Sequence, residues 1–306
     1  MEVDVLIPVY RPDGKLTELL KRLKMQNYPI HRVILMNTEE KHFPTELTGI
    51  WDRVEVYHLA KEEFDHGGTR DRGVRMSTAD LVLCMTQDAM PADETLIEEL
   101  VKPFDDPEVW AAYARQLPNE DCREVEKYTR SFNYPEQSMV KTKEDLDRLG
   151  IKTFFCSNVC AAWRRKKYLE LGGFVKHTIF NEDMILAGTM IKQGGKIAYC
   201  AKAKVIHSHN YSAFQQFHRN FDLAVSQTMY PEVFGGIRSE SEGIKLVKKS
   251  LSYCIKIGKP WLMIQVVTQS AGKLLGYKMG QRYRSLPMWL ILRCTMSPSF
   301  WRGGKA

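Results

Sequence analysis

The stretch Leu81–Pro91, with the sequence LVLCMTQDAMP, constrains the fold more than any other part of this chain. It begins as a continuous apolar run, turns polar at Thr86-Gln87-Asp88, and reaches a proline at Pro91. A run of this kind is typical of a central strand that is buried on both faces. Its polar end would then lie at the carboxyl edge of a parallel sheet, where open α/β sheets bind their ligands.

Asp88, at the end of this strand, can be interpreted in two ways. A carboxylate at this edge can hold a divalent cation against a phosphate. It can also simply begin the next helix, because PADETLIEEL follows and acidic residues suit a helix N-terminus. These residues alone leave both interpretations open.

Strands and helices alternate around this stretch. Apolar runs predict strands at Val3–Val9, Arg32–Met36 and Val54–Leu59, and leucines at helical spacing predict a helix at Lys15–Met25. This order, with its short connections, predicts an α/β fold: a Rossmann-like, mostly parallel central sheet flanked by helices, with right-handed crossovers.

Length and cysteine content limit the class of protein. With 306 residues, the chain can form one large α/β domain and an appendage. Seven cysteines without a CxxC pair predict reduced thiols in a cytoplasmic protein. A strand predicted to begin within three residues of Met1 argues against a signal peptide, and no apolar run reaches 18 residues, so we expect no membrane-spanning helix.

The charge is divided unevenly along the chain. From Gly243 to Ala306 there are eight lysines, four arginines and no acidic residue, a balance of +12 in a chain whose total is +7. We therefore predict a body at 1–240 and a basic helical tail at 241–306. Apolar residues recur at helical spacing in the tail, together with aromatic residues such as Trp261 and Trp289.

Basic amphipathic helices with interfacial aromatic residues suit an anionic membrane surface. The alternative is that the tail packs on the body or on another protein. Nucleic acid is not favoured as a partner, because no recognised binding motif accompanies the charge.

The segment Phe64–Gly73, FDHGGTRDRG, is predicted to be a glycine-rich loop that opens a helix. It has neither the G-x-G-x-x-G spacing of dinucleotide sites nor a P-loop. Its backbone, beside Arg70 and Arg72, suits a diphosphate. A well-capped turn is the alternative.

The second half of the chain offers three further features. EKYTRSFNYPEQ, within residues 110–150, is typical of a mobile lid or acceptor loop. Phe154–Trp163 resembles a strand interrupted by Ser157 and Asn158. Lys196–Ile206 is predicted to be another strand, and the histidines His207 and His209 follow it. An imidazole there can complete a metal's shell beside a carboxylate, and which of the two does so is open.

Glu182 and Asp183 begin the predicted helix that contains MILAGTMIKQGG. One interpretation is that they simply cap the N-terminus of this helix. As a functional pair, one carboxylate could deprotonate a hydroxyl nucleophile while the other orients a sugar.

Taken together, these stretches resemble inverting glycosyltransferases of family 2, which have the GT-A fold. Within that family they are most similar to bacterial rhamnosyltransferases that use dTDP-L-rhamnose. The matching stretches are IPVYRP at 7–12, FDHGGTRDRG at 64–73, TQDAMP at 86–91, FFCSNVCAAWRRKKYLELGGF at 154–174, NED at 181–183 and VIHSHNYS at 205–212. LLGYKMGQRYRSLP and PSFW extend the similarity to nearly the whole chain.

The resemblance implies a role for individual residues. Asp183 would be the catalytic base, with Glu182 beside it. Asp88 matches the second aspartate of the family's DxD motif, whereas Thr86 replaces the first, so Asp88 and His207 would hold Mg²⁺ or Mn²⁺. The residues implied in nucleotide-sugar binding are Pro8, Tyr10, Asn37, His66, Gly67, Arg70, Gln87, Asp88 and Asn158.

The implied activity is transfer of L-rhamnose from dTDP-β-L-rhamnose, with inversion, to a hydroxyl of a lipid-linked saccharide in cell-surface polysaccharide synthesis. The enzyme would be cytoplasmic and peripheral on the inner face of the cell membrane. Alternatives are a family 2 transferase that uses a UDP-hexose and a non-catalytic membrane-associated adaptor with a GT-A fold. A sugar-nucleotide pyrophosphorylase is less favoured, because IPVYRPDGK only loosely imitates the loop it requires.

Overall fold

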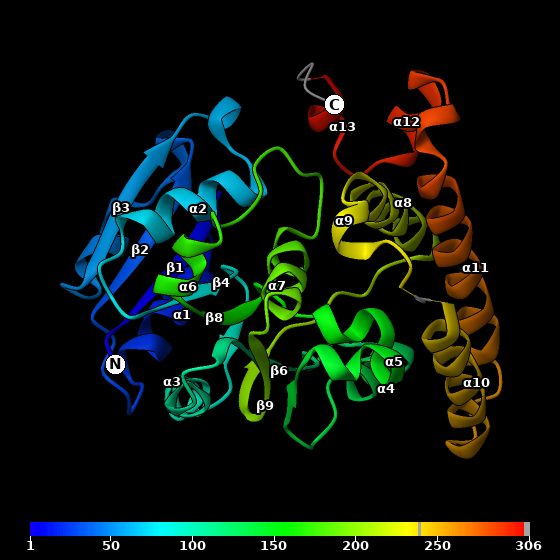
Figure 1. Cartoon of the computed structure of the whole chain (residues 1–306), viewed down its shortest axis with the longest axis horizontal. Coiled ribbons are helices and arrows are strands. Elements are labelled where there is room, and N and C mark those ends of the chain that lie inside the picture. Colours follow the sequence, from blue (N-terminus) through cyan, green and yellow to red (C-terminus); the bar gives the residue numbers. More distant parts are fainter. Residues whose placement is uncertain (238–239, 303–306) are drawn as a thin grey trace. The chain divides into compact units, whose positions relative to one another are not determined.

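The computed structural model describes residues 1–237 and 240–302, coloured along the chain in Figure 1. Contacts divide the chain into two compact units. The first contains residues 1–119, 134–176 and 182–207, and the second contains residues 120–133, 177–181 and the described part of 208–306. This division does not follow the predicted limits 1–240 and 241–306, whose functional meaning stays a prediction. Residues 303–306 of the predicted tail lie outside the described residues.

The first unit is built on one sheet with the strand order β3-β2-β1-β4-β8-β6-β9-β5, and β7 pairs with β9. Parallel pairs join β3, β2, β1 and β4, and β6 is parallel to β9, whereas β8 is antiparallel to both β4 and β6. The strands are β1 (Val3–Tyr10), β2 (Arg32–Thr38), β3 (Val54–Leu59), β4 (Leu81–Met85), β5 (Met90–Pro91), β6 (Val109–Leu117), β7 (Met139–Lys141), β8 (Cys160–Arg164) and β9 (Lys196–Ile206). The predicted α/β class with a mostly parallel sheet is confirmed.

The central strand β4 is buried along its whole length, as its apolar sequence predicts. Helices flank the sheet in this unit. For α1, Asp13 accepts a hydrogen bond from the Lys15 amide and the leucines predicted to form its inner face are buried. The α-helices of the unit are α1 (Gly14–Lys24), α2 (His66–Met76), α3 (Leu96–Val101), α5 (Leu146–Leu149), α6 (Arg165–Glu170) and α7 (Glu182–Lys192).

The prediction of a glycine-rich loop at Phe64–Gly73 was wrong. Helix α2 already begins at His66, because Asp65 caps it by accepting a hydrogen bond from the Gly68 amide. A Cβ atom on Gly67 would lie 1.9 Å from the carbonyl oxygen of Val175. This glycine therefore serves close packing of the first helical turn rather than flexibility.

Two other segments also differ from their predictions. Within Phe154–Trp163 only the part from Cys160 is a strand, and a 3₁₀ helix (Gly150–Phe154) comes before it. The polar pair Ser157-Asn158 separates the 3₁₀ helix from the strand. The side chains of both residues and the Asn158 amide form hydrogen bonds with groups other than the neighbouring strands' backbones. The first part of EKYTRSFNYPEQ is not a loop, since it lies in helix α4 (Glu124–Asn133).

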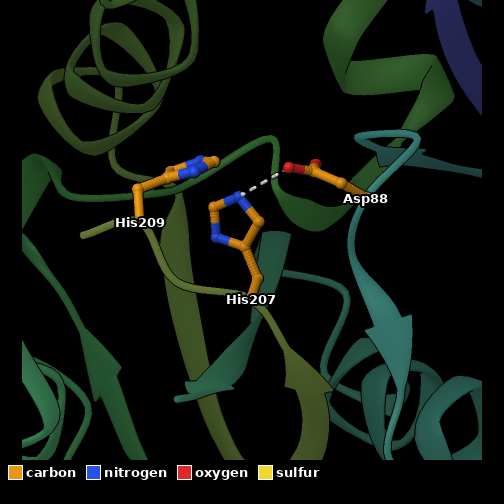
Figure 2. A group of neighbouring side chains, drawn as sticks. All are labelled: Asp88, His207 and His209. Carbon is orange, nitrogen blue, oxygen red and sulfur yellow. Dashed lines mark ion pairs between the residues drawn. The ribbon is translucent and has the colours of Figure 1, made fainter. Parts of the chain in front are cut away.

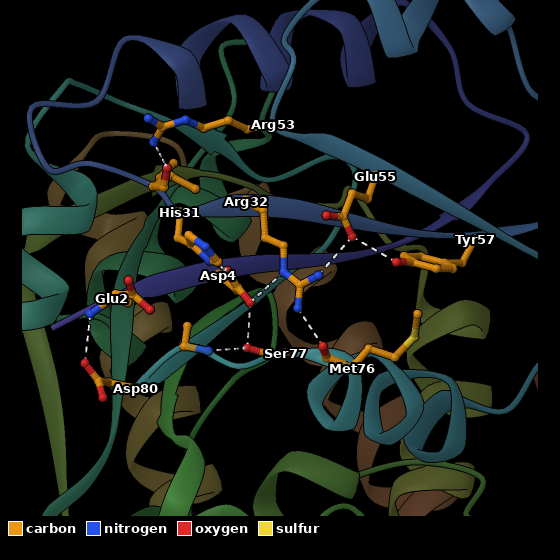
Figure 3. Close-up of polar contacts among 12 residues, drawn as sticks. Glu2, Asp4, His31, Arg32, Arg53, Glu55, Tyr57, Met76, Ser77 and Asp80 are labelled. Carbon is orange, nitrogen blue, oxygen red and sulfur yellow. Dashed lines mark hydrogen bonds and ion pairs between the residues drawn. The ribbon is translucent and has the colours of Figure 1, made fainter.

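A buried carboxylate ties the amino ends of the parallel strands together (Figure 3). Asp4 of β1 is fully buried and accepts hydrogen bonds from Arg32 Nε at 3.0 Å and Ser77 Oγ at 2.6 Å. The Nη1 atom of the same guanidinium donates a hydrogen bond of 3.0 Å to the carboxylate of Glu55 in β3. Because the strands are parallel, this network stabilises one edge of the sheet and leaves the carboxyl edge to ligands.

The second unit is helical and includes both helices predicted in the tail, α10 and α11. Its helices are α4, α8 (Ala213–Met229), α9 (Pro231–Phe234), α10 (Glu240–Lys256), α11 (Leu262–Gln281), α12 (Met288–Cys294) and α13 (Pro298–Arg302). No helix in the described parts of the chain combines the length and apolar character that a bilayer crossing requires.

Helices α8 and α11 lie side by side (Figure 1), with three glycines at the contact. Cβ atoms on Gly272, Gly276 and Gly280 would lie 2.1–2.4 Å from carbonyl oxygens of α8. A four-residue spacing places these glycines on one face, so the two backbones approach more closely than any larger residue would permit.

Candidate active site

Two carboxylates begin helix α7 and are bound by the same residue. Asp183 Oδ2 accepts a hydrogen bond of 2.9 Å from the Asn158 main-chain amide, and Glu182 Oε1 accepts one of 3.2 Å from Asn158 Nδ2. The remaining polar atom of that side chain, Asn158 Oδ1, accepts from Trp163 Nε1 at 2.9 Å. Asn158 is buried, so these bonds hold it in a single orientation between the carboxylates and the sheet.

Arg70 joins this group from helix α2. Its Nη1 lies 3.1 Å from Glu182 Oε1 and also donates to the carbonyl oxygen of His66 at 2.9 Å. Its Nε is buried and has no hydrogen-bond partner among the described residues. A buried guanidinium N–H in this condition suits an anionic ligand, since buried polar groups are nearly always hydrogen-bonded.

The surroundings separate the two carboxylates electrostatically. Burial, followed by the negative charge of Glu182, raises the pKa of Asp183 to about 7. Burial also acts to raise the pKa of Glu182, but Arg70, His66 and the Asn158 bond outweigh it and hold that pKa below its ordinary value. Two adjacent carboxyls whose pKa values are driven apart can serve separate tasks, one as an ionised anchor and one as a proton acceptor near neutral pH.

His66 and Gly67 lie in the first turn of α2, next to Arg70. Burial lowers the pKa of His66, although the charge of Glu182 opposes this effect. Gly67 permits the close approach of α2 to Val175 described above, which fixes the helix start that carries Arg70.

A second group of polar side chains lies at the ends of β4 and β9 (Figure 2). His207 Nε2 is 3.6 Å from Asp88 Oδ2. One ligand atom from each of Asp88, His207 and His209 lies within 4.8 Å of those of the other two. A carboxylate oxygen and imidazole nitrogens at this spacing can hold a divalent cation such as Mn²⁺.

Gln116 orients the buried imidazole of His207. Its Nε2 donates to Ser157 Oγ at 3.2 Å, so its Oε1 is left to accept from His207 Nδ1, also at 3.2 Å. With the proton on Nδ1, the Nε2 lone pair is directed at Asp88. A lone pair facing a carboxylate favours a cation between them, and the residues therefore fit a metal ion. The Thr86 hydroxyl nearby in the chain is buried without a hydrogen-bond partner among the described residues.

The residues predicted to line the nucleotide pocket follow β1, β2 and β4. Tyr10 and Gln87 bond reciprocally: the Tyr10 amide donates to Gln87 Oε1 at 2.9 Å, and Gln87 Nε2 donates to the Tyr10 carbonyl at 3.1 Å. Asn37 Nδ2 contacts His58 Nδ1 at 2.9 Å, and Pro8 precedes the end of β1. The fold thus brings strand ends together at one edge, and the nucleotide-binding role of these residues stays a prediction.

Sequence reasoning missed two residues that support the candidate site, Gln116 and Trp163. Gln116 is a polar residue near the end of a buried strand, the same signal that singled out Asp88. Trp163 gave no such signal, because an aromatic residue in an apolar run is ordinarily a core residue.

Residues 4–172 match the model of glycosyl transferase family 2. The chain is 37% identical to the O-antigen chain rhamnosyltransferase RfbN of Salmonella typhimurium over 98% of its own length and 96% of that protein. It is 40% identical to the O-antigen chain rhamnosyltransferase WbaN of Salmonella anatum, over 79% of this chain and 78% of that one.

Solved structures show the same fold at low identity. The mannosyltransferase PcManGT from Pyrobaculum calidifontis, solved with GDP-Man and Mn²⁺, superposes with a TM-score of 0.58 at 14% identity, covering 97% of this chain and 87% of that one. TarS 1-349 of S. aureus gives 0.56 at 13% identity, covering 93% and 92%. With its GT-A fold and these matches, the chain belongs to glycosyl transferase family 2.

Proposed function

We propose that this enzyme transfers L-rhamnose from dTDP-β-L-rhamnose to a hydroxyl group of a saccharide acceptor in O-antigen-type polysaccharide synthesis. The observation that carries the chemistry is Asp183, a carboxylate with a pKa near 7 that is held by two main-chain amides at the start of α7. The choice of rhamnose is supported by the similarity to RfbN and WbaN, which are named rhamnosyltransferases.

The proposed reaction is a single displacement. Asp183 removes the proton of the acceptor hydroxyl while the oxygen attacks the anomeric carbon from the face opposite the leaving group. The bond from that carbon to the dTDP oxygen breaks as the new glycosidic bond forms, so a β-linked donor gives an α-rhamnoside. Ionised Glu182 holds Arg70, whose unpaired Nε then binds the departing diphosphate.

A divalent cation, Mg²⁺ or Mn²⁺, would be held by Asp88 and His207, with His209 as a third candidate ligand, and would neutralise charge on the diphosphate. The protein contributes by holding these ligand side chains in position before the cation binds. Gln116 holds the His207 imidazole in the tautomer that leaves Nε2 available.

We further propose that the acceptor is lipid-linked and that the enzyme works at the inner face of the cell membrane as a peripheral protein. Support comes from α11 and its N-cap residue Trp261, because their large exposed apolar side chains lie at positions that place them toward one side of the helix. They are Trp261, Ile264, Val267, Leu274 and Leu275. Exposed lysines of α10 would add attraction to anionic lipids.

A donor screen tests this function against its alternatives. The full-length protein with MnCl₂ is incubated with dTDP-β-L-rhamnose, UDP-glucose or UDP-galactose and a pool of lipid-linked saccharides, and release of nucleoside diphosphate is measured. We expect release with dTDP-rhamnose alone, and an α-rhamnosyl linkage in the product. Release with a UDP-hexose instead would replace the donor, and no release with any sugar nucleotide would favour the non-catalytic adaptor.

A further inference from the structure

Three cationic side chains from different helices lie near one another in the second unit. Arg130 comes from α4, Arg219 from α8 and Lys273 from α11. All three are partly buried. Their helices pack together: Val125 of α4 and Val266 of α11 share an apolar cluster, and the glycines of α11 lie against α8.

Aromatic rings and a hydrogen bond define where two of these cations lie. The Arg219 guanidinium is 4.6 Å from the centre of the Phe180 ring and 5.7 Å from that of Tyr211. Gln269 Nε2 donates to the Tyr211 carbonyl oxygen at 2.9 Å, and Lys273 follows Gln269 by one helical turn on the same face of α11. Stacking on aromatic rings restricts the motion of a guanidinium group. Its N–H groups lie at the edge of the stacked plane, where they can still donate hydrogen bonds to a ligand.

The charges of this cluster are not balanced. Glu126 pairs with Arg130 at 2.8 Å, whereas Lys273 makes no hydrogen bond or ion pair within the described residues. Burial lowers the pKa of Lys273, and Arg130 and Arg219 lower it further although Glu126 opposes them. Like charges brought together and partly desolvated destabilise a fold, so their arrangement indicates a ligand of opposite charge.

We propose that Arg130, Arg219 and Lys273 bind a phosphate or diphosphate group, and that this group is the one that joins the acceptor saccharide to its lipid. Two guanidinium groups and an ammonium match the several oxygens of such a group. The assignment to the acceptor rests on the proposed function. It is supported by the chain itself, because Phe180 precedes Asp183 by three residues and Tyr211 follows His207 by four.

Binding of inorganic pyrophosphate to the full-length protein tests the site directly. The measurement uses calorimetry in the Arg70→Met background with a chelator present, so that the donor's own diphosphate site does not contribute. We expect Lys273→Gln and Arg219→Gln to weaken binding by roughly 10- to 100-fold, as expected for losing a charged hydrogen-bond donor. Lys278→Gln, an exposed lysine of the same helix, is the matched control and should bind as the parent does.

Lys273→Arg separates charge from packing. It keeps the cation, so pyrophosphate binding should stay within about threefold of the parent even where Lys273→Gln loses it. Equal pyrophosphate affinity in all variants, or loss of affinity in Lys273→Arg together with a lowered melting temperature, would overturn the site.

Two acceptors identify the group that the site binds. One carries the saccharide on a short, water-soluble isoprenyl diphosphate, and the other carries the same saccharide on a neutral alkyl chain. We expect Lys273→Gln to raise KM at least about tenfold for the first acceptor only, while the donor KM and the kcat are unchanged. An equal effect on both acceptors, or none, rejects the assignment to the acceptor.

Binding to phosphatidylglycerol vesicles is the remaining measurement of this test. If Lys273→Gln weakens vesicle binding but leaves pyrophosphate binding unchanged, the cluster binds phospholipid headgroups and the acceptor assignment is rejected. If the parent enzyme transfers no rhamnose but pyrophosphate binding still depends on Lys273, the anion site is supported and the proposed function fails by itself.

Discussion

Asn158 binds Asp183 through its main-chain amide at 2.9 Å while its side chain binds Glu182 at 3.2 Å. A single residue before β8 thus sets the position of both carboxylates at the start of α7. Trp163, which lies in β8, donates a hydrogen bond to the side chain of Asn158 and so fixes its orientation. The proposed base is therefore held in place before any substrate binds, which is the arrangement that lowers reorganisation during a reaction.

Replacing Asp183 with Asn should remove transfer and spare donor binding. The amide cannot accept the acceptor's proton, so we expect kcat to fall by about 10²- to 10⁴-fold. Affinity for dTDP, measured by calorimetry, should change less than about threefold, because Arg70 and Asp88 are untouched. Asp147→Asn, at an exposed position of α5, is the control. Unchanged turnover in Asp183→Asn would rule out this residue as the base.

The pH dependence of kcat should report the same carboxyl group. Only ionised Asp183 can accept a proton, and its pKa is raised to about 7, so kcat should increase with pH up to about 7 and level off above. Glu182→Gln removes one of the charges that raise this pKa and should move the rising limb to lower pH. A limb that stays at the same pH in Glu182→Gln would contradict the coupling between the two residues.

The raised pKa also predicts a cost in stability. The native state holds the Asp183 proton more tightly than the unfolded chain does, so unfolding free energy should decrease as pH rises from about 4 to about 7. Asp183→Asn lacks this decrease, so its stability relative to that of the parent should be higher at pH 8 than at pH 4. Urea denaturation at pH 4 and pH 8 measures this difference, and an equal difference at both pH values would refute it.

Much of this arrangement could be predicted from the sequence, for identifiable physical reasons. The strand β4 was predictable because a buried parallel strand is apolar throughout and ends in polar residues. Glu182 and Asp183 were singled out because they begin an obvious helix. Their pairing with Arg70 was not predictable, since it depends on how α2 packs against α7.

The features that were predicted wrongly or missed also have local physical causes. Two adjacent glycines suggested a flexible loop at Phe64–Gly73, whereas tertiary packing against Val175 requires glycine inside a helix. A strand was predicted in this region, but the antiparallel direction of β8 was not, because an apolar run does not encode strand direction. Gln116 was overlooked because its role is to orient His207, a contact between residues 91 positions apart.

Metal dependence should follow from Asp88 and His207. Treatment with a chelator should abolish transfer, and Mn²⁺ or Mg²⁺ should restore it. Asp88→Ala should raise the concentration of Mn²⁺ needed for half-maximal activity by at least about tenfold, and Gln116→Leu by about 10- to 100-fold through loss of the imidazole orientation. Asp93→Asn, at an exposed aspartate that follows β5, is the control. Full activity in the presence of chelator would exclude the metal.

The exposed side of α11 should determine binding to lipid. Each large apolar side chain moved from water into a membrane interface contributes about 1.5–3 kcal/mol when fully buried, so Ile264→Ser combined with Leu275→Ser should reduce sedimentation with phosphatidylglycerol vesicles at least about tenfold. Met25→Ser, which changes an exposed apolar side chain of the first unit, should have no effect.

Point substitutions are preferable to a chain ending near residue 240. Removing α11 would strip α8 of the helix whose Gly272, Gly276 and Gly280 lie against its backbone, and any loss of vesicle binding could then reflect unfolding. A truncated chain should also lose sedimentation, but only the substituted full-length protein separates lipid contact from stability. If Ile264→Ser/Leu275→Ser sediments as well as the parent does, this side of α11 does not bind the membrane, and the basic residues of α10 become the remaining source of attraction.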